Sequence, residues 1–260
     1  NKLVEKILAF DELDLDDGNR LMSRPVLESF LNDPVLIDML FCPLMYYGNA
    51  REGDMDFYQF VIMFKSIFIE GFSKPEGGMH YILNLMADKF KELGGELKMG
   101  SGIKTINASQ GIVGSVTLEN DEELATEAVL SSMGYVETLN RCEPFVAEAA
   151  KCKTGQLSFM ESLFVVDKEP RDLGYDRSIV FFSTQSKFDY KVPEDLIDIS
   201  SGVLCCTNNF QYPKPMKEGL IRLTNLASFG KWDRLVRKDY IAAKKECRGR
   251  ALEALFTIFP

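Results

Sequence analysis

The sequence predicts an α+β fold with an antiparallel sheet, and three observations carry that prediction. Apolar residues recur with a 3.6-residue period from Met79 to Leu93, which indicates an amphipathic helix. After Gly95 the pattern changes to short segments in which apolar and polar residues alternate, as in strands with one buried face. Four further strand-like segments follow in the second half, separated by loops that contain Pro, Asp and Gly.

The first 70 residues are expected to be helical. Pro25 to Leu31 forms one short helix, and Asp33-Pro34 caps and starts a second, which Gly48 ends. The acidic run from Asp11 to Gly18 resembles a calcium loop only superficially, because placing its glycine at the sixth position puts a leucine at the first ligand position. We expect a solvated acidic turn there.

The most apolar stretch of the chain, Phe57 to Ile69, is also read as a helix. It has thirteen residues and contains Gln59 and Lys65, whereas a membrane span needs roughly 20 apolar residues. We expect a buried helix or the wall of a substrate tunnel. The start of the chain shows no secretory signal and already follows a helical pattern.

The strand-like segments fall into two groups. After the helix at Met79 come Glu96 to Met99, Ile103 to Ile106, a hairpin-like Gly111 to Leu118, and an apolar run from Ala128 to Ser132. The second group consists of Leu157 to Asp167, Ser178 to Ser183, Gly202 to Thr207 and Leu220 to Ser228. Residues 231 to 258 are expected to be helical, with core-facing members at Leu235, Ala243, Cys247, Leu252 and Leu255.

Composition excludes several classes of function. The formal net charge of −9 and the pI near 4.9 argue against a nucleic-acid partner, which clustered Lys and Arg would bind. Six cysteines without a CxxC pair and a single histidine leave no zinc finger or ribbon. We expect reduced thiols and a cytoplasmic protein, and no disulfide between Cys205 and Cys206, because neighbours in a strand point to opposite faces.

No motif for catalysis by side chains alone is found. One histidine with no Ser elbow or Cys partner gives no nucleophilic triad. The carboxylates Glu119, Asp121, Glu122 and Glu123 form a charge run at a hairpin tip, which is typical of a solvated face. Gly100-Ser101-Gly102 lacks the third glycine of a dinucleotide-binding motif and precedes a strand, so it is interpreted as a turn.

The run from Lys74 to Met79, Lys-Pro-Glu-Gly-Gly-Met, opens the amphipathic helix and is followed by paired glycines and short strands. This order resembles the middle of the phytoene desaturase, carotenoid isomerase and retinol saturase group of FAD-dependent oxidoreductases, within the flavin amine oxidase superfamily. Tyr46-Tyr47-Gly48, the segment from Pro213 to Gly219 and Trp232 extend the resemblance along the chain. The family's N-terminal glycine fingerprint and C-terminal flavin segment are not found, so we expect an internal part of a longer protein.

The resemblance implies two domains. Residues 1–71 and 141–260 correspond to a substrate domain, helical in its first segment, with an antiparallel sheet and a C-terminal helix in its second. Residues 72–140 correspond to the middle portion of an FAD-binding α/β domain. The cofactor implied is FAD, which this chain alone is expected to hold weakly or not at all.

The resemblance also implies site residues. Ile103 matches the position beside the adenine, Gly134 falls at a strand end near the pyrophosphate, and Gly77 and Gly78 lie towards the flavin ring. Substrate-binding candidates are Met79, His80, Phe60 and Phe64, the last two from a Met- and Phe-rich wall suited to a long hydrocarbon. Taken one at a time, such apolar residues are more often ordinary core, and core packing explains Ile103 equally well. A lone histidine near a helix start is more often packed or exposed than catalytic.

The expected activity is desaturation, reduction or isomerisation of carbon–carbon bonds in an apolar, polyene-like small molecule. A flavin carries the hydride while the protein orients substrate and excludes water, so few catalytic side chains are required. Two alternatives stay open: a non-catalytic lipid- or prenyl-binding module similar to Rab escort and dissociation-inhibitor proteins, and an amine-oxidising flavoenzyme. The resemblance leaves room for peripheral membrane contact and gives no oligomeric state.

Overall fold

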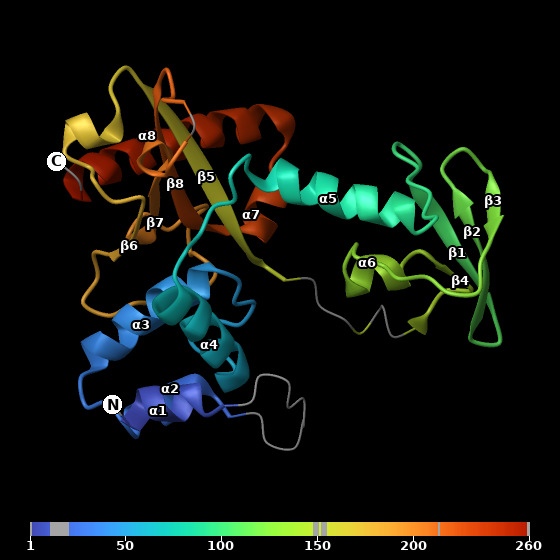
Figure 1. Ribbon diagram of the computed structural model, residues 1–260, viewed down its shortest axis with the longest axis horizontal. Helices are drawn as coiled ribbons and strands as arrows, with labels where there is room; N and C mark the ends of the chain where they lie inside the picture. Colours follow the sequence, from blue (N-terminus) through green and yellow to red (C-terminus); the bar gives the residue numbers. More distant parts are fainter. Residues whose placement is uncertain (1, 11–20, 148–150, 152–154, 213, 259–260) are drawn as a thin grey trace. The chain divides into compact units, whose positions relative to one another are not determined.

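A computed structural model describes residues 2–10, 21–147, 151, 155–212 and 214–258. The chain divides into two compact units, which Figure 1 shows with their elements labelled. We call residues 1–76 with 155–260 the large unit and residues 77–154 the small unit. Helices and predominantly antiparallel sheets occur together, so the predicted α+β class is confirmed.

The large unit is built on a four-stranded antiparallel sheet of order β5-β8-β7-β6. Its strands are β5 (Leu157–Val166), β6 (Ile179–Ser183), β7 (Ser201–Cys206) and β8 (Gly219–Ser228), each within a residue or two of its predicted span. Strands β5 and β8 pair over ten residues, from Leu157 opposite Ser228 to Val166 opposite Gly219, without a bulge. Two short 3₁₀ helices, Pro170–Leu173 and Thr207–Asn209, lie in the connections.

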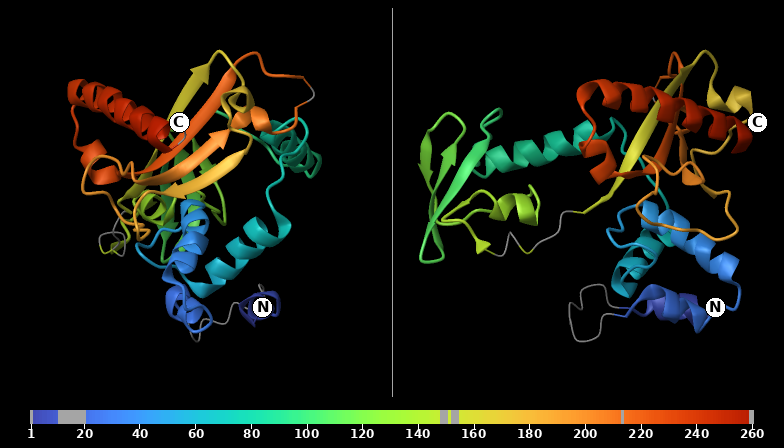
Figure 2. Two further views of the ribbon diagram at one scale, coloured as in Figure 1. Left: turned by 90° about the vertical axis from the view of Figure 1, so that its left-hand side faces the viewer. Right: turned by 180° about the vertical axis from the view of Figure 1, so that it is seen from behind.

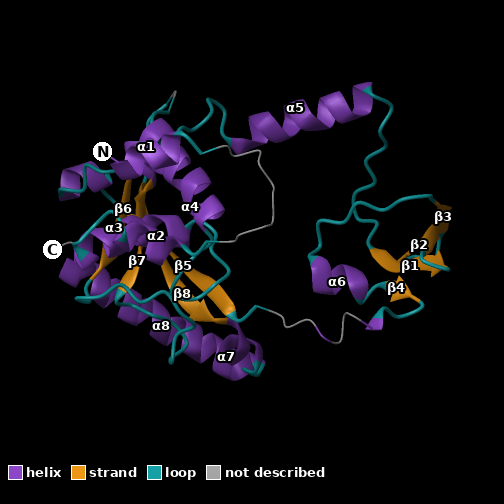
Figure 3. Ribbon diagram, turned by 90° about the horizontal axis from the view of Figure 1, so that it is seen from below, coloured by secondary structure: helices purple, strands orange, loops and turns teal. Residues whose placement is uncertain are grey.

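One face of this sheet is covered by the N-terminal helices, as Figure 3 shows. They are α1 (Lys2–Leu8), α2 (Ser23–Glu28), α3 (Pro34–Tyr46) and α4 (Phe57–Phe64), which continues as a π-helix over Lys65–Glu70. The predicted cap of α3 is confirmed, because the Asp33 carboxylate accepts hydrogen bonds from the amides of Val35 and Leu36. The predicted acidic turn lies in residues 11–18, outside the described part of the chain.

The opposite face of the sheet is covered by α7 (Phe229–Asp233) and α8 (Arg237–Ile258), seen from two sides in Figure 2. The single C-terminal helix predicted over 231–258 is therefore wrong in one respect, because the chain turns at residues 234–236. Cys247 and Leu255 are buried against the sheet as predicted, and Ala251 lies between them. This four-residue spacing keeps one stripe of α8 towards the strands.

The small unit contains α5 (Met79–Glu92), a four-stranded sheet of order β3-β2-β1-β4, and a short helix α6 (Tyr135–Leu139). Strand β1 (Ile103–Ser109) pairs with β2 (Ile112–Leu118), a single strand that fills most of the segment predicted to be hairpin-like. Strand β3 (Glu123–Ala125) pairs with β2 across the predicted turn at Asn120-Asp121, and β4 (Cys142–Glu143) runs parallel to β1. The predicted helix at Met79 is confirmed.

Two predicted β segments of the small unit are wrong. Residues Glu96 to Met99 and Ala128 to Ser132 are not strands, and Leu97, Met99 and Leu130 are exposed. An apolar segment becomes a strand only when a neighbouring strand accepts its backbone hydrogen bonds. In the described part of the small unit, the edge of β1 next to β2 is already paired, and its other edge carries only the two residues of β4.

The units differ from the predicted domains in their boundaries. The structure divides the chain at 76/77 and at 154/155, whereas the prediction divided it at 71/72 and at 140/141. The residues added to the small unit include β4, whose pairing with β1 belongs to that unit's sheet. The assignment of the large unit to substrate and of the small unit to FAD stays a prediction.

Candidate functional site

Strand β5, at one edge of the large unit's sheet, exposes apolar side chains. They lie on the face of the sheet that α3 covers over β6 and β7. Phe159, Leu163 and Val165 alternate along β5 and are 39%, 60% and 56% exposed. Side chains two residues apart share one face of a strand, so these three point the same way. Phe159 lies opposite Leu226, which is buried in the core beneath the N-terminal helices. The exposed side chains therefore continue that core beyond the edge of α3.

Two exposed aromatic residues from outside the sheet lie over the same face, at its β6 side. The ring of Tyr47, directly after α3, stacks on Phe72 with centroids 5.1 Å apart and meets Phe181 of β6 at 5.7 Å. Tyr46 contacts Phe159 at 5.8 Å. We use the name aromatic face for five exposed residues: Tyr47, Phe72, Phe159, Leu163 and Val165.

A small polar group interrupts the aromatic face. The guanidinium of Arg222 lies 3.8 Å from the carboxylate of Glu161, and the hydroxyl of Thr224 donates to the same carboxylate at 3.3 Å. Burial raises the pKa of Tyr47, Cys205 raises it further, and Arg222 lowers it. The phenol of Tyr47 therefore stays protonated at neutral pH and can offer one hydrogen bond to a ligand on an otherwise apolar surface.

A buried chain of hydroxyl groups leads away from the aromatic face. Ser201 Oγ donates to Asp198 Oδ2 at 2.7 Å and lies 2.9 Å from the hydroxyl of Tyr46. Because a serine hydroxyl has one proton and Ser201 gives it to the carboxylate, Tyr46 must donate to Ser201. Burial is the largest cause that raises the pKa of Tyr46, so this donor stays protonated.

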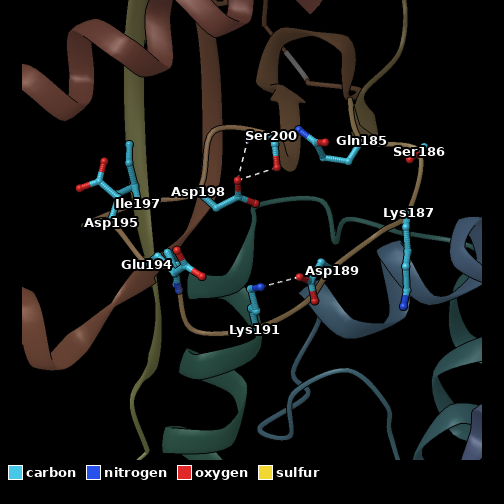
Figure 4. A pocket seen from close by; sticks show the side chains of 11 residues that line it. Gln185, Ser186, Lys187, Asp189, Lys191, Glu194, Asp195, Ile197, Asp198 and Ser200 are labelled. Atoms are coloured by element: carbon cyan, nitrogen blue, oxygen red, sulfur yellow. Dashed lines mark hydrogen bonds and ion pairs between the residues drawn. The ribbon is translucent and has the colours of Figure 1, made fainter.

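Asp198, which ends this series of hydroxyl groups, lines a separate polar pocket of about 450 Å³ in the connection from β6 to β7. Figure 4 shows Ser200 against Asp198 and the pair formed by Asp189 and Lys191, which are 2.8 Å apart. Asp195 has a lowered pKa because it accepts a hydrogen bond from the amide of Leu196 and one from Arg250. The pocket presents mixed charges, and no cluster of metal ligands occurs in the described residues.

Two predicted substrate residues lie in the core of the large unit. Phe60 is fully buried and Phe64 is 7% exposed, and their rings are 5.8 Å apart. Phe60 also meets Phe41 and Phe57, with centroids 5.8 and 6.0 Å away. Packing between helices accounts for both residues, and their contact with a substrate stays a prediction.

The start of α5 in the small unit holds two predicted flavin-binding residues, Gly77 and Gly78, and two predicted substrate-binding residues, Met79 and His80. Gly77 and Gly78 have positive φ angles of 84° and 72°, which the turn into the helix requires and only glycine adopts readily. Met79 is 61% exposed and His80 is also exposed. The structure brings none of them into a described pocket.

The predicted FAD residues Ile103 and Gly134 are both in the small unit. Ile103 begins β1 and is half-buried, whereas Gly134 precedes α6 and so does not end a strand as predicted. A carboxylate oxygen of Glu137 lies close to Gly134, where an added Cβ would meet it at 2.5 Å. Because like charges repel, the exposed Glu137 carboxylate would have to move before a pyrophosphate could bind at Gly134, and binding there stays a prediction.

Sequence reasoning missed the aromatic face and the buried hydroxyl chain. The alternation of Phe159, Glu161 and Leu163 was visible as a strand pattern, but which of its faces stays uncovered depends on how far α3 extends over the sheet. Ser201 and Asp198 are common residue types without a motif, so their meeting with Tyr46, 155 residues away from Ser201, could not be read from spacing.

Comparison with known proteins gives a fold relationship only. No family model and no curated protein matches the sequence. Among solved structures, the chain is similar to an oxidoreductase from Methanosarcina mazei, with a TM-score of 0.59 and 14% identity over 99% of this chain. The match covers 56% of that protein, so the chain spans just over half of its length. In the described residues, no helix combines the length and apolar character needed to cross a bilayer.

Proposed function

We propose that this chain is part of an FAD-dependent oxidoreductase similar to phytoene dehydrogenases, and that the aromatic face binds its apolar, polyene-like substrate. The observation that carries the proposal is the row Phe159, Leu163 and Val165, which leaves apolar surface exposed on a well-packed unit. Exposed apolar surface on an otherwise buried sheet marks binding sites. The M. mazei protein, called an oxidoreductase, supports the general reaction class.

A flavin would supply the hydride chemistry, and this chain's residues would bind and orient the substrate. The aromatic face would pack against the hydrocarbon, and the Tyr47 hydroxyl would hold a polar end group where the substrate has one. Glu137 beside Gly134 would have to move before a pyrophosphate could bind on the small unit. The proposal therefore assigns phosphate binding to segments of a longer protein.

The first test is an absorbance spectrum of the complete product of the gene that encodes this chain. Two visible flavin bands, with FAD released on denaturation, are the expected result. A colourless and folded product would contradict the flavoenzyme assignment and favour the lipid- or prenyl-binding alternative, because the aromatic face would then bind without redox chemistry.

The second test addresses the aromatic face itself in the 260-residue chain. Diphenylhexatriene, an apolar polyene that fluoresces when it leaves water, should bind, and the double variant Phe159→Ser, Leu163→Ser should bind it at least tenfold more weakly. Phe256→Ser is the matched control, because Phe256 is 63% exposed on α8 and belongs to no part of the face. An equal loss of diphenylhexatriene binding in both variants would refute the aromatic face as the binding site.

A further inference from the structure

Strand β5 leaves one long backbone edge without a partner. It is the outer strand of the order β5-β8-β7-β6, and among the described residues its ten members pair only with β8. Alternate residues of an edge strand point their amide and carbonyl groups outwards. Proline and bulges, which usually protect such an edge, do not occur in β5.

A groove follows this edge between β5 and α8. One part has a volume of about 500 Å³ and is lined by residues 160–163 of β5 and by one face of α8. The adjoining part, of about 290 Å³, continues to Ser158 and ends at three aromatic residues, Phe229, Trp232 and Tyr240. Six consecutive residues of the edge strand therefore line a continuous groove with an aromatic end.

The other end of the groove is cationic. Lys244, Lys245 and Arg248 line it from α8, and none of them forms a salt bridge within the described structure. The carboxylate of Glu161 also lines the groove, and it pairs with Arg222. Lys244 and Arg248 are four residues apart, a spacing at which like charges destabilise a helix. Three unpaired cations in one groove are notable in a chain with a net charge of −9.

A buried hydroxyl adds to the unsatisfied polar groups of the groove. Ser162 is 4% exposed, lines the cationic part, and its Oγ has no hydrogen-bond partner in the described structure. Buried polar atoms of folded proteins are nearly always hydrogen-bonded. The groove thus brings together three kinds of group without partners: the backbone edge of β5, the three cations of α8 and the hydroxyl of Ser162.

We propose that this groove binds an extended acidic peptide segment, which adds a strand to the edge of β5. Its backbone would pair with residues 158–163, and its carboxylates would bind Lys244, Lys245 and Arg248. Strand addition of this kind takes affinity from main-chain hydrogen bonds and specificity from side-chain pockets. A second copy of the chain is the poorer occupant, because two-fold pairing of β5 edges would bring two cationic grooves together.

The test uses the fluorescence of Trp232, which is the chain's only tryptophan and lines the groove. The blocked peptide Val-Glu-Val-Asp-Val-Glu should shift its emission saturably, and Val-Lys-Val-Lys-Val-Lys should not. The double variant Lys244→Gln, Arg248→Gln should bind the acidic peptide at least tenfold more weakly. The double variant Arg237→Gln, Lys238→Gln, which removes the same number of positive charges at exposed positions of α8 outside the groove, should alter affinity less than twofold.

Two further experiments distinguish strand addition from simple anion binding. An acidic peptide N-methylated at every residue cannot donate main-chain hydrogen bonds and should lose binding. Equal binding of the methylated peptide, or its displacement by millimolar inorganic phosphate, would overturn strand addition. Absence of binding by the acidic peptide, or dimers of the chain that this peptide does not dissociate, would overturn the assigned occupant.

Discussion

The large unit and the small unit differ in how completely they bury their own apolar side chains. The N-terminal helices of the large unit enclose fully buried residues such as Phe41, Phe60 and Leu226. In the small unit, α5 buries no side chain, and its apolar members Leu83, Leu85 and Met86, among others, are about half to two-thirds exposed. The difference shows that a strong helical pattern fixes secondary structure without fixing what the helix packs against.

The largest expected effect comes from a substitution in the core of the large unit. Phe60→Ala removes a fully buried ring from contact with three other aromatic residues. The lost burial and the cavity should lower the free energy of unfolding of the large unit by about 3–5 kcal/mol. Urea unfolding followed by Trp232 fluorescence measures this, because that reporter lies in the large unit.

Phe256→Ala is the control for that measurement, since its ring is 63% exposed and substitution there should change stability by less than about 0.5 kcal/mol. Similar losses in the two variants would contradict a core centred on Phe60. They would also reopen the prediction that Phe60 lines a substrate channel, since a channel residue tolerates truncation.

Much of the fold could be predicted because it depends on local patterns. Alternation along β2 and the Asp33-Pro34 cap act within a few residues of the chain. The errors arose where the outcome depends on distant partners. Ala128 to Ser132 is apolar enough for a strand, but in the described chain no strand pairs with it.

The candidate site was less predictable than the fold, for a related reason. The aromatic face exists because α3 ends at Tyr46 and covers only part of the sheet, a property of tertiary packing. Phe60 and Phe64 are large apolar residues, as are Phe159 and Leu163. Only the degree of burial distinguishes the two core residues from the two surface residues. Residue type alone could not choose between them.

Alkaline pH should weaken the large unit through its buried thiols. Burial raises the pKa of Cys42 from 9.0 to about 12 and that of Cys206 to about 11. Between pH 9 and 11 the unfolded chain releases these protons while the folded chain keeps them, so stability is complete below pH 9 and falls above it. The loss should be at most about 1.4 kcal/mol per pH unit for each thiol.

The measurement is the urea midpoint of Trp232 fluorescence at pH 8, 9 and 10. Cys42→Ala should remove at most about half of the fall, once its own effect at pH 8 is subtracted, because burial also raises the pKa of Cys247. A midpoint that stays constant up to pH 10 would show that these thiols are not buried as described.

A smaller effect is expected from the buried hydroxyl chain. Tyr46→Phe removes the hydrogen bond to Ser201, while Ser201 keeps its bond to Asp198, so the large unit should lose about 1 kcal/mol. Tyr47→Phe is the matched control, because Tyr47 is 44% exposed and its hydroxyl makes no hydrogen bond within the described structure. Equal effects of the two variants on urea unfolding would argue against the Tyr46–Ser201–Asp198 arrangement.

The smallest effect tests the small unit directly. Leu83→Ala truncates an apolar side chain of α5 that is 53% exposed, so the 260-residue chain should lose less than about 0.5 kcal/mol beyond the difference in helix propensity. Hydrogen exchange measures the change locally, since the amides of α5 should exchange faster than those of β8 at the centre of the large unit's sheet.

The same substitution in the complete gene product sharpens the comparison of the two units. If additional residues of that product cover the apolar face of α5, Leu83→Ala should lower its free energy of unfolding by about 2 kcal/mol or more, as for a buried leucine. A small effect in both proteins would mean that the face stays exposed, and the exchange rates of α5 should then agree between them. A large effect already in the 260-residue chain would contradict the exposure of α5, because truncation is costly only where the removed atoms were packed.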